Sequence, residues 1–231
     1  MNRTISVIKM HMRDKFSWLV LPWLICLISF AVNLFIGGIV NPEEGIYTGG
    51  VSSLYIYLFV LGIIIVPQTF SFALGMGVRR KDYFTGTLAA FIGLGAGSTV
   101  LLMLLSETEH SWFVGWGVGL HFFHLPFAHE GSLLLQAFTH FTLLLLMFCS
   151  GFFIASIYRR FGKTGMYIFS LGAFLIFGFT PLLISYYDRW DEIGRWVEAN
   201  VHTLNDLTPW LLILAALFAL GSFGLLRRST V

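Results

Sequence analysis

The sequence predicts an all-α, polytopic membrane protein with six transmembrane helices. Of its 231 residues, 57% are hydrophobic and only 11% are charged, whereas a soluble domain typically carries about 25% charged residues. Several apolar runs also reach or exceed roughly 18 residues, the length of a helix that crosses a bilayer core. Composition and run length together exclude a soluble globular domain.

A surface helix is expected before the first membrane crossing. In Met1–Phe16, apolar residues such as Ile5 and Ile8 recur at helical spacing, and Arg3 and Lys9 occupy positions between them. This pattern is typical of a basic amphipathic helix that lies on the inner membrane surface. A basic tail without regular structure is the alternative.

Six apolar segments follow, each with the length of a transmembrane helix. They are Ser17–Val40, Ser52–Met76, Thr85–Leu105, Ser132–Ile157, Met166–Ser185 and Pro209–Leu226. Gly93 and Gly97 form a GxxxG pair that permits close helix approach, but this motif is common in apolar segments and identifies no particular contact. Cys26 and Cys149 lie inside apolar runs and are interpreted as buried small hydrophobic residues.

Two further segments are expected on the outer surface. Ser106–Gly131 contains the aromatic-rich stretch Ser111–Ala128, which suits the depth of the lipid headgroups. A crossing there would export the basic loop Tyr158–Gly165, so we interpret the stretch as an interfacial or re-entrant segment. Residues Tyr186–Thr208 alternate apolar and charged side chains at helical spacing and predict an amphipathic outer helix.

The distribution of charge predicts the orientation of the chain. With six crossings, every Lys and Arg except Arg189 and Arg195 falls on the side of the N-terminus. Every Asp and Glu except Asp14 and Asp82 falls on the opposite side. Because cytoplasmic loops of membrane proteins are enriched in Lys and Arg, both the N-terminus and the C-terminus are predicted to be cytoplasmic.

The predicted spans contain few groups that could drive transport or catalysis. They hold no Asp, Glu, Lys or Arg, although ion-coupled transporters usually carry such groups at membrane depth. His140 is interpreted as a packing histidine rather than a proton relay. The chain has no phosphate-binding loop, so any ATPase must be a separate polypeptide, and no catalytic residue is assigned.

A cluster of possible ligands lies in the first outer segment. His121, His124, His129 and Glu130 could bind zinc, but glycines and Pro126 disfavour the regular helix that would align them. They are interpreted as interfacial side chains, and no metal site is predicted.

The stretch Phe72–Thr87, FALGMGVRRKDYFTGT, is the main candidate for a functional contact. It places three consecutive basic residues between two spans, in the predicted cytoplasmic loop Gly77–Phe84. It resembles a segment of small bacterial permeases of the type-2 ABC export class, in which a G-x-x-R-[RK]-x-[YF]-[FY] run follows the second span. Six spans, cytoplasmic termini and an N-terminal amphipathic helix also resemble that class.

The resemblance implies that this loop forms a coupling helix, which docks into a cleft of a separate ABC ATPase. The contacts would be made by Val78, Arg79, Arg80, Lys81, Asp82, Tyr83 and Phe84. It further implies that ATP and Mg bind the ATPase rather than this chain, which has no cofactor of its own. The permease would pair with a second permease as a homodimer or heterodimer. The alternative is that the basic residues only anchor the chain to anionic lipid.

Residues 1–231 are therefore expected to form a single transmembrane permease domain in a bacterial cytoplasmic membrane, in contact with lipid and without a nucleic-acid partner. Because the predicted spans lack charged groups, a lipid, a hydrophobic peptide or an amphiphilic antibiotic fits as the exported substrate better than a hydrophilic ion. The alternative function is a non-transporting immunity or sensor protein that binds a peptide or a partner protein.

Overall fold

The protein is built from α-helices, as the sequence predicts. The computed structural model describes residues 3–40, 46–111, 115–123, 132–201 and 203–229. Its helices are α1 (Arg3–Arg13), a π-helical turn at Phe16–Val20 that leads into α2 (Leu21–Val40), α3 (Ser52–Gly75), α4 (Arg80–Ser111), α5 (Leu133–Tyr186), α6 (Trp190–Asn200) and α7 (Leu204–Arg227), with a short 3-10 turn at Gly115–Gly117. Two short strands, β1 (Ile46–Tyr47) and β2 (Leu120–His121), pair in parallel.

Five helical segments of the described chain are long and apolar enough to cross a membrane. They are Phe16–Val40, Ser52–Gly75, Arg80–Glu109, Leu133–Tyr186 and Leu204–Arg227. The third is longer than predicted, because the helix begins at Arg80 rather than at Thr85. The predicted fourth and fifth spans both lie inside α5, and most of the predicted loop between them is helical.

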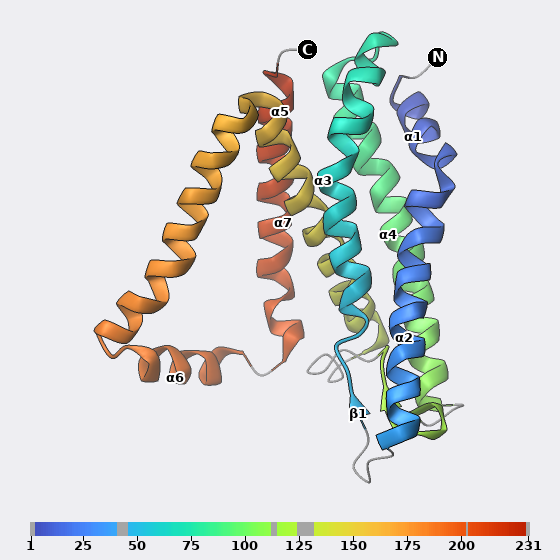
Figure 1. Cartoon of the computed structure of the whole chain (residues 1–231), viewed down its shortest axis with the longest axis vertical. Helices are drawn as coiled ribbons and strands as arrows, with labels where there is room; N and C mark the ends of the chain where they lie inside the picture. The colour runs from blue at the N-terminus through green and yellow to red at the C-terminus, as the bar shows by residue number, and fades with distance from the viewer. Residues whose placement is uncertain (1–2, 41–45, 112–114, 124–131, 202, 230–231) are drawn as a thin grey trace.

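The backbone of α5 is broken at Gly162. Its 54 residues would extend about 80 Å as a straight helix, far more than the roughly 30 Å of a bilayer core. Gly162 has φ 64° and ψ −154°, which is not a helical conformation. Figure 1 shows two arms of α5 that meet at the end of the molecule where both termini lie.

The two arms of α5 differ in their surroundings. The buried residues of α5 extend from Thr139 to Ile157 and therefore all belong to the first arm. The second arm stands away from the other helices in Figure 1, and α6 joins its far end to α7. No residue of α6 is buried. The helix predicted within Tyr186–Thr208 thus forms over Trp190–Asn200, and it is exposed.

Helices α3 and α5 approach closely through a pair of glycines. A Cβ atom on Gly62 would clash with the carbonyl oxygen of Phe148, and one on Gly151 would clash with the carbonyl oxygen of Phe59. Small residues at such a crossing let two helix backbones come together. For Gly93 and Gly97, the predicted GxxxG pair, no atom lies within 4 Å of the place that a Cβ atom would take, so no close approach occurs there.

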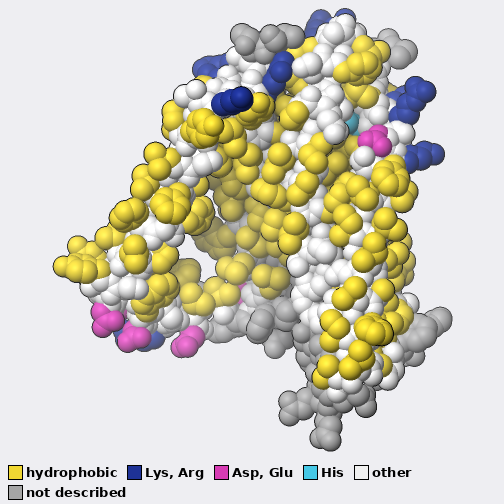
Figure 2. All heavy atoms as spheres, in the orientation of Figure 1, with side chains coloured by type: hydrophobic (Ala, Val, Ile, Leu, Met, Phe, Trp, Pro, Cys, Tyr) yellow, Lys and Arg dark blue, Asp and Glu magenta, His cyan; other side chains and the backbone are white. Residues whose placement is uncertain are grey.

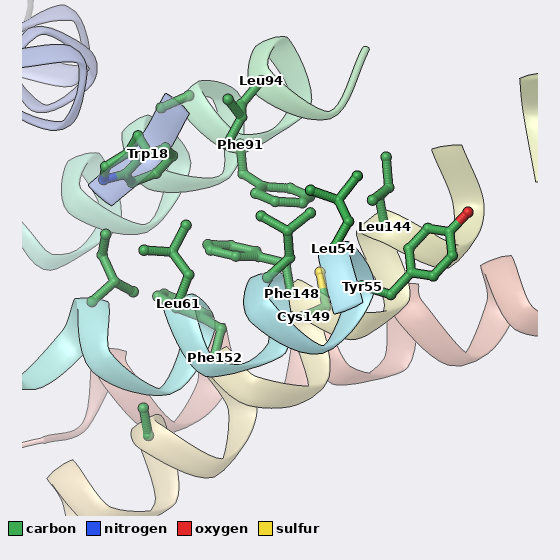
Figure 3. Packing of buried hydrophobic residues seen from close by; sticks show 14 of the residues in the cluster. Trp18, Leu54, Tyr55, Leu61, Phe91, Leu94, Leu144, Phe148, Cys149 and Phe152 are labelled. Carbon is green, nitrogen blue, oxygen red and sulfur yellow. The ribbon is translucent and has the colours of Figure 1, made fainter. Parts of the chain in front are cut away.

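Aromatic rings fill the centre of the bundle next to this crossing. Phe91 of α4 stacks on Phe148 of α5, with ring centroids 3.9 Å apart and planes at 6°, and Phe152 follows at 5.8 Å from Phe148 (Figure 3). Cys149 lies beside them in Figure 3 and is buried, as Cys26 is. Both cysteines are therefore buried in the core, as the sequence predicts.

The N-terminal amphipathic helix forms as predicted, and it packs against the bundle through Val7 and His11. Val7 and His11 are each 1% exposed, and α1 packs along α4, where Gly86 leaves room for Val7. His11 Nε2 lies 2.9 Å from Thr87 Oγ1, and burial lowers the pKa of His11 to about 4 although Asp14 opposes the shift. Ile5, part of the predicted apolar stripe, is 49% exposed.

The glycine crossing makes a direct prediction for stability. Gly151→Ala would place a methyl group against the backbone of α3, and we expect it to lower the free energy of unfolding by about 1–3 kcal/mol through overpacking. Gly93→Ala is the matched control, because its surroundings are open. Thermal unfolding of the detergent-purified variants measures the difference, and equal midpoints for the two would contradict the close approach of α3 and α5.

Candidate functional site

The predicted loop Gly77–Phe84 is in fact a short turn followed by a helix. Helix α3 ends at Gly75, and Gly77 has φ 78°, a conformation that glycine adopts at no steric cost. The amide of Val78 donates to the carbonyl of Ala73 at 3.1 Å, which closes the end of α3. Because α4 begins at Arg80, the last five residues of the predicted loop form its first turn.

Tyr83 and Phe84 hold this turn against the bundle. Tyr83 is fully buried, and its hydroxyl lies 2.8 Å from Thr69 Oγ1 on α3. Its ring packs edge-on against Phe70, with centroids 5.0 Å apart. Phe84 is 9% exposed and packs against Phe152 of α5 and against α7. In this conformation neither side chain is available to the partner contact that the resemblance implied for them.

The other residues of the predicted contact remain accessible. Arg79 and Lys81 are exposed, and Val78, Arg80 and Asp82 are half-buried. Arg80 points toward the end of α7, where its Nη1 lies 3.4 Å from the carbonyl oxygen of Arg227. A partner at this turn would therefore meet chiefly two exposed basic side chains.

A groove beside the turn adds further residues to this surface. A cavity of about 810 Å³ opens between α1 and the end of α3. Its walls include Arg3, Lys9, Arg13, Phe72, Met76 and Val78. We call this cavity the basic-end groove. Phe72 and Met76 are 59% and 69% exposed, so an apolar floor lies among basic side chains. Figure 2 shows Lys and Arg gathered at this end of the molecule.

Sequence reasoning missed the contribution of α1 to this groove. Arg3, Lys9 and Arg13 are far from Met76 in the sequence, and only the packing of α1 along α4 brings them to the turn. One signal could have indicated that α1 lies near this turn. The sequence analysis places both of them on the same side of the membrane.

The opposite end of α4 carries a buried carboxylate that the sequence analysis did not single out. Glu109 is 0% exposed. Its Oε2 accepts hydrogen bonds from Trp116 Nε1 at 2.9 Å and from the amides of Phe122 and Phe123 at 3.0 and 3.1 Å. His121 Nδ1 lies 4.0 Å from the other carboxylate oxygen. Glu109 thus ties residues 115–123 to the end of α4.

Residues 115–123, within the first segment predicted to lie outside, form a compact cap. Trp116 has φ 57°, and Gly115, Gly117 and Gly119 also have positive φ, so the chain winds tightly back toward Glu109. The ring of Phe30 on α2 packs against the rings of Trp116, Phe122 and Phe123. Helix α2 is thereby joined to the same cap.

Most of the His and Glu residues considered as possible zinc ligands, and interpreted as interfacial side chains, lie outside the described residues. His124, His129 and Glu130 belong to that part of the chain, and His121 lies beside Glu109. Within the ranges that the structure describes, no three or more His, Cys, Asp or Glu residues are grouped to hold a metal ion.

Two polar contacts join helices inside the bundle. The hydroxyl of Tyr55 on α3 lies 2.6 Å from His140 Nδ1 on α5. Thr139 of α5 donates to Asn205 Oδ1 of α7 at 2.7 Å, and Thr208 Oγ1 lies 2.9 Å away. The sequence interpretation of His140 as a packing histidine agrees with its 3% exposure and its contact with Tyr55.

Comparison with known proteins gives no match to any family model, any curated protein or any solved structure.

The cap makes a prediction for Glu109. Glu109→Gln keeps the size of the side chain but removes the charge that strengthens its hydrogen bonds, and we expect a loss of about 1.5–3 kcal/mol in the stability of the cap. Hydrogen exchange of residues 115–123 measures it. Glu107→Gln is the control, because the Glu107 carboxylate is exposed and accepts only from Ser111 among the described hydrogen bonds. Equal exchange rates in the two variants would contradict the role of Glu109.

Proposed function

We propose that the chain is the permease subunit of an ATP-driven ABC exporter, with six membrane crossings and both termini in the cytoplasm. The observation that carries this proposal is the accessible basic surface at one end of the bundle, formed by the basic-end groove together with Arg79 and Lys81. The resemblance of Phe72–Thr87 to the coupling segment of type-2 permeases supports the same assignment.

The two arms of α5 support six crossings. Each arm is long enough to cross a bilayer core of about 30 Å, and Gly162 reverses the chain between them at the end that holds the termini (Figure 1). Figure 2 shows that Lys and Arg gather at this end, whereas acidic side chains outnumber basic ones around α6 at the opposite end. Because cytoplasmic segments are enriched in Lys and Arg, this distribution supports a cytoplasmic location of the basic end.

The nature of the spans supports ATP as the energy source. In the five long apolar segments of the described chain, charged side chains lie at the ends or at the bend of α5. Ion-coupled transport would require ionisable groups at mid-membrane depth. With no phosphate-binding loop in the chain, ATP and Mg would bind a separate ATPase. An apolar or amphiphilic substrate fits these surfaces better than an ion.

The docking role of the basic end is tested by charge reversal. Arg79→Glu with Lys81→Glu is expected to lower ATP hydrolysis in the reconstituted complex roughly ten-fold or more, because like charges across an interface cost several kcal/mol. The ATPase to use is a phosphate-loop protein encoded in a neighbouring reading frame. ATP turnover in proteoliposomes measures the coupling.

The control variant carries Lys15→Glu and Lys163→Glu. Both lysines are exposed and lie outside the basic-end groove, so this variant makes the same change in net charge. Normal coupled turnover in the Arg79 and Lys81 variant, or an equal loss in the control, would refute docking at this surface.

A non-transporting immunity or sensor protein is the second candidate. The observation in its favour is the second arm of α5 with α6, which contains no buried residue and is free to receive a partner. Such a protein would protect or signal in cells that lack any partner ATPase, whereas the permease would lose its function there.

A further inference from the structure

A second cavity lies where α5 bends and meets α7. Its volume is about 890 Å³, within the range of about 300–1,000 Å³ that holds drug-sized ligands. Aromatic and aliphatic side chains from both arms of α5 and from α7 form most of its wall. They include Phe153, Ile157, Phe161, Ile168, Phe169 and Phe223. It is distinct from the basic-end groove, which lies between α1 and α3.

The cavity exists because its walls contain glycines and because α5 reverses its direction. Gly165, Gly221 and Gly224 line it and contribute no side chains. Gly162 turns the second arm of α5 away from α7, which keeps the space between the helices open. Phe161 and Ile168 are 52% and 68% exposed, so part of the apolar wall is accessible from outside the molecule.

Three arginines form the polar rim of the cavity. Arg160 follows the first arm of α5, and Arg227 and Arg228 lie at the end of α7. Within the described part of the chain, none of them forms an ion pair with Asp or Glu. Arginine presents a planar set of donors that matches a phosphate group. The cavity therefore combines an apolar wall with a rim of positively charged side chains that can bind an anion.

An apolar wall with a basic rim favours one class of ligand over the others. A free phosphate would leave the apolar wall unfilled, and a neutral lipid would leave the arginines without a counter-charge. A symmetric second copy of the chain on this face would bring two sets of arginines together, which like-charge repulsion disfavours. A lipid with a phosphate headgroup and acyl chains satisfies both parts, and basic pockets between transmembrane helices on the cytoplasmic side bind such headgroups.

We infer that the cavity between the bend of α5 and the end of α7 binds one anionic phospholipid. Its phosphate lies against Arg160, Arg227 and Arg228, and an acyl chain lies along Phe153 and Phe223. The bound lipid fills the space beside the unburied second arm of α5. This site does not depend on transport; it requires only that the chain lies in a membrane.

Native mass spectrometry of the detergent-purified chain tests the site with phosphatidylglycerol and phosphatidylcholine of the same acyl chains. The unaltered protein is expected to retain one phosphatidylglycerol in preference to phosphatidylcholine. Arg160→Gln, Arg227→Gln and Arg228→Gln together are expected to weaken its retention roughly ten-fold or more, since each basic side chain near a membrane surface adds to the attraction of anionic lipid. Equal retention by the triple variant would overturn the inference.

The matched control carries Arg3→Gln, Lys9→Gln and Arg13→Gln. It removes the same charge from the same end of the molecule but leaves the cavity unchanged. Retention of phosphatidylglycerol should persist in it. An equal loss in both variants would show attraction by net charge alone and would overturn the site.

A space-filling variant tests the apolar half without altering any charge. Gly224 lines the cavity and has nothing within 4 Å of a Cβ position, so Gly224→Leu directs a side chain into the space without a clash at its Cβ atom. This variant is expected to lose phosphatidylglycerol. If the triple arginine variant fails to fold, the result for Gly224→Leu tests the lipid site on its own. Retention by Gly224→Leu, or displacement of the lipid by millimolar glycerol phosphate, would show an anion site without an apolar pocket and would overturn the inference.

Discussion

The reversal of the chain at Gly162 is the constraint on which the rest of the structure depends. Its backbone, with φ 64° and ψ −154°, lies in a region that is essentially restricted to glycine. This one residue divides a 54-residue helix into two arms and sends the second arm away from the bundle (Figure 1). It also gathers Arg159, Arg160 and Lys163 at the end where both termini lie. Without it, α7 would not return to the bundle beside the first arm.

Two other contacts hold the helices together at different positions along the bundle. The glycine pair at Gly62 and Gly151 sets the distance between α3 and α5, so that the stacked phenylalanines can fill the centre. At the far end, Glu109 satisfies two backbone amides and one indole at once. At the basic end, the packing contacts are made by buried side chains such as Val7, His11 and Tyr83. Arg79 and Lys81 are exposed there, so their charges are accessible to a partner.

The sequence predicts the helical membrane class, the amphipathic helices and the buried cysteines, because composition and helical periodicity are local properties. It predicts the start of α4 poorly, because the charges of Arg80–Asp82 are typical of a loop. The contacts of Tyr83 with Thr69 and Phe70, which hold this turn of helix against α3, are not visible in the local sequence. It also gives no indication of the role of Glu109, whose partners are mostly backbone amides. The basic-end groove depends on a contact between α1 and the end of α3, which no local pattern encodes.

Membrane topology around Gly162 tests the central claim most directly. In a background with Cys26→Ser and Cys149→Ser, single cysteines are placed at Lys81, Lys163, Glu107 and Glu192, which are all exposed. A membrane-impermeant maleimide on intact cells should label positions 107 and 192, and positions 81 and 163 only after permeabilisation. Labelling of positions 163 and 192 from the same side would show that the second arm of α5 does not cross the membrane and would contradict the account.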